Sequence, residues 1–131
     1  MNLDLFVKAL ADESHWPVTR DGEAYTITVP LKEGRSQNVR LEGLETKKLR
    51  LVRFTSPVGP ASDLSGERPL SALKLNAELA LGALAVSGKN LVVTDTVLLD
   101  GANAKALVAT LLYLAEQGDR YEKLLYGQDR H

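Results

Sequence analysis

Apolar residues recur along the chain at two different spacings, and each spacing predicts one kind of element. Close to the N-terminus four of them lie three or four positions apart, which is the spacing of one face of an amphipathic helix. These four residues are Leu3, Phe6, Val7 and Leu10. Asp4 and Lys8 lie off this face, so we predict a short helix with one buried side.

The same helical spacing runs through a much longer stretch, residues 103–127. Its apolar face is formed by Leu107, Leu111, Leu114, Tyr121 and Leu125. Asp100 or Asn103 can cap the start of this helix, and Gly127 can end it. A helix of this length is comparable to the width of a small domain, so we expect it to lie across one face of a sheet.

Strands are predicted where apolar residues alternate with polar ones. Residues 23–31 place Tyr25, Ile27, Val29 and Leu31 on one face. Residues 36–45 repeat the alternation with Val39 and Leu41, and Gly34 lies between the two runs. We therefore predict a hairpin, preceded by a turn at the Pro17 and Asp21-Gly22 positions.

The third run, residues 47–56, has apolar residues on both faces. Leu49 and Leu51 share one face of the strand, whereas Val52 and Phe54 lie on the other. A bulge could return all four to one core, or the strand could make apolar contacts on both sides. In the second case one pair forms a subunit or peptide interface.

Residues 57–69 are rich in Pro, Gly and Ser, and we predict a loop there. A helix follows from Pro69, and near its end the Asn76 side chain can bond to the backbone. Gly82 allows a conformation or a close approach that a side chain would block. Residues 83–87 and 90–100 then form a second hairpin.

The predicted order is α-β-β-β-α-β-β-α, which is an α+β fold: a mainly antiparallel sheet with the helices packed on one face. The length of 131 residues suits one domain, 1–131. A net charge of -1 offers no overall field for nucleic acid or anionic lipid. Without cysteine there is no disulfide or thiolate chemistry, and no apolar run reaches the roughly 20 residues of a membrane span. We expect a cytoplasmic protein.

No motif for catalysis, metal or cofactor binding is present, and we predict none of these. The histidines, His15 and His131, have no further ligands at compatible spacing. Gly59 and Gly66 lack the context of a phosphate loop. The alternative is a small-molecule-binding protein or enzyme with a site under the 57–69 loop, in which Asp95 or Arg68 takes part.

One concentration of basic residues stands out, on the second and third predicted strands. It consists of Arg40, Lys47, Lys48, Arg50 and Arg53. Phe54 is its only aromatic neighbour, so a solvated face or a docking surface for an acidic partner is favoured over nucleic acid. Our predicted partner or dimer interface is Leu49, Arg50, Leu51, Val52, Arg53 and Phe54.

Three stretches of the chain, "LKLNAELALGALAV", "LVVTDTVLLD" and "LLYLAEQGDRYEKLL", resemble the C-terminal half of the type III secretion chaperone-like fold, including its YbjN-like relatives, a family of sensory-transduction regulators. The resemblance implies a small homodimer without catalysis, which offers apolar grooves to an extended segment of another protein. It also implies that Asn76 and Gly82 mark the passage from helix to strand. We therefore expect a chaperone-like or regulatory protein-binding module.

Overall fold

The computed structural model describes residues 2–127, which form three α-helices and six strands. The helices are α1 (Leu3–Ser14), α2 (Arg68–Leu75) and α3 (Ala104–Tyr126). The strands are β1 (Val18–Asp21), β2 (Ala24–Pro30), β3 (Ser36–Thr46), β4 (Leu49–Pro60), β5 (Ala83–Ser87) and β6 (Asn90–Leu98). Short 3-10 turns occur at Lys32–Gly34, Ala61–Asp63 and Asn76–Glu78.

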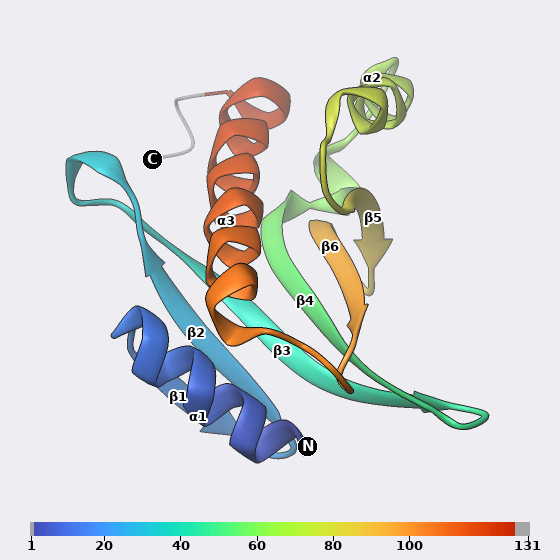
Figure 1. Cartoon of the computed structure of the whole chain (residues 1–131). Coiled ribbons are helices and arrows are strands. Elements are labelled where there is room, and N and C mark those ends of the chain that lie inside the picture. Colours follow the sequence, from blue (N-terminus) through green and yellow to red (C-terminus); the bar gives the residue numbers. More distant parts are fainter. Residues whose placement is uncertain (1, 128–131) are drawn as a thin grey trace.

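The strands form one antiparallel sheet in the order β1-β2-β3-β4-β6-β5 (Figure 1). This arrangement confirms the predicted α+β class, with one strand more than the predicted order. The additional strand, β1, lies where we predicted only a turn. It is short and nearly all exposed, so its residues show no apolar alternation, and it forms because it pairs with β2 along the sheet edge.

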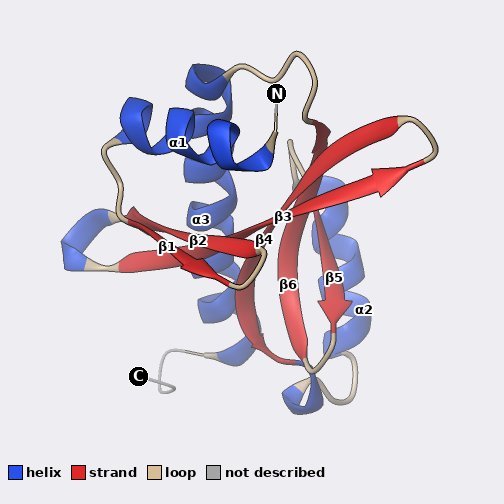
Figure 2. Ribbon diagram, turned by 90° about the horizontal axis from the view of Figure 1, so that it is seen from below, coloured by secondary structure: helices blue, strands red, loops and turns tan. Residues whose placement is uncertain are grey.

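All three helices pack on the same face of the sheet. Helix α3 crosses β2, β3, β4 and β6, α1 lies beside α3, and α2 packs on β5. Figure 2 shows the opposite face of β4, β6 and β5 in front of α2 and α3, with no helix over it. The hydrophobic core therefore lies between the helices and one side of the sheet.

Strand β4 resolves the ambiguity of the third predicted run. Burial alternates regularly from Leu51 to Ser56, and the register with β3 is unbroken from Leu49 to Thr55, so no bulge returns the apolar residues to one side. The register shifts further on, between Pro57 and Gly59, where a proline cannot donate to the ladder. The strand nevertheless continues to Pro60, so the first four residues of the predicted loop 57–69 are strand.

The connection from α2 to β5 depends on the two residues that interrupt its apolar sequence. The Leu84 amide donates to Asn76 Oδ1 at 2.6 Å, and Asn76 Nδ2 donates to the Leu84 carbonyl at 3.4 Å. The Asn76 side chain thus occupies part of the free edge of β5. Gly82 has φ +73°, and a Cβ there would lie 2.6 Å from the Thr94 carbonyl oxygen. Both predictions for this connection are confirmed.

Helix α3 begins and ends as its sequence predicts. Asn103 Oδ1 accepts from the Ala106 amide at 3.0 Å, and Gly127 follows the last turn with φ +79°. Gly118 lets the helix approach the sheet, since a Cβ there would lie 3.0 Å from both Gln37 Nε2 and Ser56 Oγ.

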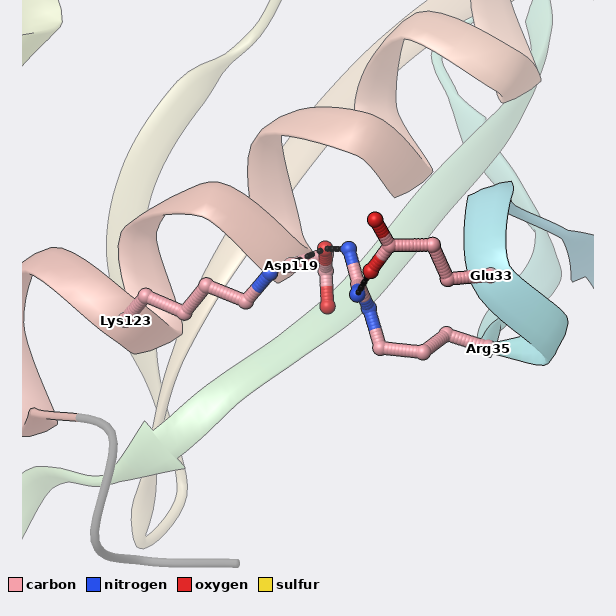
Figure 3. Close-up of polar contacts among 4 residues, drawn as sticks. All are labelled: Glu33, Arg35, Asp119 and Lys123. Carbon is pink, nitrogen blue, oxygen red and sulfur yellow. Dashed lines mark hydrogen bonds and ion pairs between the residues drawn. The ribbon is translucent and has the colours of Figure 1, made fainter.

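Polar contacts attach α3 to the connection between β2 and β3 (Figure 3). Asp119, which is mostly buried, accepts from Arg35 at 2.9 Å and lies 3.5 Å from Lys123 Nζ. Arg35 also bonds to Glu33 at 3.1 Å. The hydrogen bond to Asp119 raises the pKa of the Arg35 guanidinium above its ordinary value. This network holds the end of the β2–β3 hairpin against the helix.

Two tyrosines link helices to the core. Tyr25 on β2 donates a hydrogen bond to Asp4 on α1, and this bond raises the pKa of the Tyr25 phenol. Tyr121 on α3 is buried, and burial raises the pKa of its phenol.

Candidate protein-binding surfaces

The predicted interface residues are divided between the two faces of the sheet. Val52 and Phe54 are 0% exposed and point into the core beneath the helices. The prediction that Val52 and Phe54 belong to an exposed partner or dimer interface is therefore wrong. They are covered because α3 packs directly on β4, and the parity of the strand puts both residues on that side.

Arg50 takes part in a contact inside the chain. Its guanidinium lies 2.7 Å from Asp100 Oδ1, and its carbonyl accepts from the Leu99 amide. Both contacts fasten the start of β4 to the segment that follows β6. Leu49, Leu51 and Arg53 alternate with Val52 and Phe54 along β4. They therefore point to the other side of the sheet, the helix-free face.

Two further leucines complete an apolar surface on this face. Leu44 of β3 and Leu98 of β6 lie directly beside Leu51 in the strand register. Leu49 is 49% exposed and Leu98 is 52% exposed. We call Leu44, Leu49, Leu51 and Leu98 the leucine patch. It lies toward the end of the sheet where the β3–β4 hairpin projects beyond the neighbouring strands (Figure 1).

A trough lined by both polar and apolar residues adjoins the leucine patch on the helix-free face. It contains one cavity of about 620 Å³ and a second of about 300 Å³, which share Thr55, Ser87 and Val92. Thr55, Thr94 and Thr96 line the larger cavity together with Arg53 and Glu42, and Ala85, Val86 and Val92 line it as well. The trough can therefore offer hydrogen bonds along a surface that crosses several strands.

The predicted basic concentration is partly neutralised. Arg40 lies 3.7 Å from Asp21 and 3.6 Å from Glu42. Arg53 Nε donates to Thr96 Oγ1 at 3.0 Å, and no carboxylate among residues 2–127 lies within ion-pair distance of it. Lys47 and Lys48 form the exposed tip of the hairpin.

An apolar groove between α2 and β5 was not predicted from the sequence. Its cavity measures about 250 Å³. It is lined mainly by Leu64, Ala72, Leu73, Leu84, Val86 and Leu91. Leu73 is 65% exposed and Val86 is 64% exposed. The only available signal was the pair Leu70 and Leu73, whose spacing is equally typical of a core-facing helix.

The residues named for a site under the 57–69 loop do not come together. Arg68 donates to the Asp63 carbonyl, whereas Asp95 accepts from the Thr96 amide and lines the trough. Leu64 and Pro69 of this segment instead border the apolar groove.

Within the described residues, no three His, Cys, Asp or Glu side chains are grouped as metal ligands would be. His15 is an exposed residue at the end of α1, and His131 lies outside the described residues. None of the helices in residues 2–127 combines the length and apolarity needed to cross a membrane.

No protein-family model matches the chain, and a search of curated proteins found no match either. The resemblance to type III secretion chaperone-like proteins stays a prediction.

Proposed function

We propose that this chain is a non-enzymatic protein-binding module, chaperone-like or regulatory, whose helix-free sheet face binds an extended segment of another polypeptide. The leucine patch is the observation that carries the proposal. Four aliphatic side chains lie together on the face that no helix covers, and burying them under a partner is favourable by about 25 cal/mol per Å². A reducing compartment such as the cytoplasm fits a chain without cysteine.

The trough supports an extended segment as the ligand. A segment that leaves the leucine patch along the sheet meets the hydroxyl groups of Thr55, Thr94 and Thr96. The Thr94 hydroxyl donates to the Phe54 carbonyl within the chain, so it can only accept from a main-chain amide of the segment. The hydroxyls of Thr55 and Thr96 can also donate to a main-chain carbonyl. An apolar anchor beside a polar surface is the usual composition of a non-obligate interface.

Site-specific photo-cross-linking tests the proposal. A photoreactive residue replaces Leu49 or Leu98, and a control replaces Leu124, which is 57% exposed but lies on α3. We expect the two sheet positions to cross-link to the same partner polypeptide in the producing cell, and Leu124 not to do so. Equal labelling from all three positions, or none from Leu49 and Leu98, would contradict the proposal.

The module acts as a homodimer through the α2–β5 groove. Leu73 projects beside a hollow that can receive an aliphatic side chain, so a second copy related by a two-fold axis offers both the projection and the hollow. The elements that border the groove carry both signs of charge, which suits a copy of the same surface. These charged residues are Asp63, Glu67, Glu78, Arg68, Lys74 and Lys89.

Light scattering tests the dimer. We expect the mass of a dimer for the native chain, a monomer for Leu73→Asp, and a dimer for the control Leu124→Asp. A native chain with the mass of a monomer would rule out this part of the proposal.

A small-molecule ligand is the second candidate, because the larger cavity of the trough has the size and the polar groups that such a ligand needs. A thermal-shift screen of metabolites tests it. A stabilising metabolite, whose effect is lost in Thr94→Val and Thr55→Val, would favour this candidate over the polypeptide.

A further inference from the structure

Arg53 lies on the helix-free face, and its guanidinium can still bind a ligand. It follows Leu51 by two positions on β4, so its side chain emerges beside the leucine patch. Thr96 accepts from its Nε, which leaves both terminal nitrogens available for a further acceptor. Glu42, its neighbour across the β3–β4 register, is instead within ion-pair distance of Arg40.

The positions of the charges on this face, and not their sum, favour an acidic ligand at Arg53. Arg40 lies within ion-pair distance of both Asp21 and Glu42, whereas Arg53 has no carboxylate within that distance among residues 2–127. At the other end of the leucine patch, Lys47 and Lys48 add positive charge at the hairpin tip. The whole chain carries a net charge of -1, so the positive charge at Arg53 and at the hairpin tip is local.

The spacing of the side chains defines the ligand further. Leu49, Leu51 and Arg53 follow one another along β4 at every second residue, about 6.6–6.8 Å apart. An extended segment laid along β4 repeats its own facing side chains at the same distance. Two aliphatic residues of the segment then cover Leu49 and Leu51 while the next facing residue meets Arg53.

We infer that this face selects an extended acidic segment. Every second residue of that segment faces the sheet, and three successive facing residues are aliphatic, aliphatic and acidic. The residues between them can be of any kind. A carboxylate at the third position forms a charge-assisted bond with the Arg53 guanidinium, whereas a lysine there is repelled. The inference rests on the proposed function, because it specifies the partner of the same surface. Nucleic acid is disfavoured because the patch beside Arg53 is aliphatic and offers no ring for base stacking.

Fluorescence anisotropy with two labelled peptides tests the inference. The first is Ser-Glu-Ser-Leu-Ser-Leu-Ser-Glu-Ser, which reads the same in both directions along β4, and the second has Lys in place of both Glu. We expect the native chain to bind the Glu peptide at least about tenfold more tightly than the Lys peptide. Arg53→Glu should reduce that preference about tenfold, whereas Arg120→Glu, the same charge change on α3, should leave it unchanged.

The outcomes separate this inference from the proposed function. Equal affinity for the two peptides, lost in the Leu49→Ser, Leu98→Ser double variant, would overturn the acidic selection and keep the polypeptide-binding face. No binding of either peptide up to about 1 mM would overturn the inference, while cross-linking from Leu49 still decides the proposed function. Tighter binding of a labelled single-stranded oligonucleotide than of the Glu peptide, lost in Arg53→Glu, would assign the face to nucleic acid.

Discussion

The two faces of the β4 strand carry similar numbers of apolar residues but have different surroundings. On one face Val52 and Phe54 are buried beneath the helices, and on the other Leu49 is exposed and Leu51 is half-buried in the leucine patch. Covered side chains contribute to the stability of the chain itself. Exposed ones contribute little until a partner covers them, so the comparison separates residues that hold the fold from residues available for binding.

The largest expected effect is on the covered face. Phe54→Ala should lower the free energy of unfolding by about 3–5 kcal/mol, because it leaves a cavity beneath α3 where the ring is 0% exposed. Urea denaturation measures the loss. A reduction below about 1 kcal/mol would mean that Phe54 is not a core residue.

A smaller loss is expected where the chain packs tightly between β6 and α3. Gly82→Ala forces an unfavourable φ and places a Cβ against the Thr94 carbonyl and Leu114, so it should cost at least about 2 kcal/mol. Gly88→Ala is the matched control, since Gly88 has φ +59° and open space around it. If both variants lose the same stability in urea, the strain comes from φ alone and the close approach has no effect.

The pKa of Tyr121 gives a pH dependence that belongs to the covered face. Burial raises this pKa above 10.0, so the folded chain holds the phenol proton more tightly than the unfolded chain does. The resulting contribution to the free energy of unfolding is fully present below pH 10.0 and is lost as the pH rises through the folded-state pKa of Tyr121. Comparison of melting temperatures at pH 9 and pH 11 (roughly one unit on either side of the ordinary phenol value) should show a smaller fall for Tyr121→Phe than for the native chain.

The smallest effect on stability is expected on the helix-free face. Leu49→Ser with Leu98→Ser should change the free energy of unfolding by no more than about 0.5 kcal/mol per site, since both leucines are about half exposed. The same double variant should lose binding of the Glu peptide. A large loss of stability in urea would show that the leucine patch is structural.

The alternation of residues along β4 was sufficient to place Leu49 and Leu51 opposite Val52 and Phe54. It was not sufficient to decide which pair is buried, because both pairs are apolar and only the packing of α3 makes the distinction. Asn76, Gly82 and Asn103 could be interpreted from the sequence because each acts on backbone within ten positions of itself or at a tight approach. The α2–β5 groove could not, because the exposure of Leu73 depends on where α2 lies relative to β5.

Strand β1, at the edge of the sheet, could not be predicted from the sequence either. Its four residues carry no alternation, and pairing with β2 alone determines their conformation. Leu44 and Leu98 likewise joined Leu49 and Leu51 through the registers of β3 and β6, which distant parts of the chain set.

The most direct test of the polypeptide-binding face is an NMR titration of the leucine methyl groups with the Glu peptide. The account predicts that the methyl signals of Leu44, Leu49, Leu51 and Leu98 shift on binding, while those of the buried Leu10 and Leu111 stay in place. Shifts confined to Leu70 and Leu73, or none in the leucine patch, would contradict it.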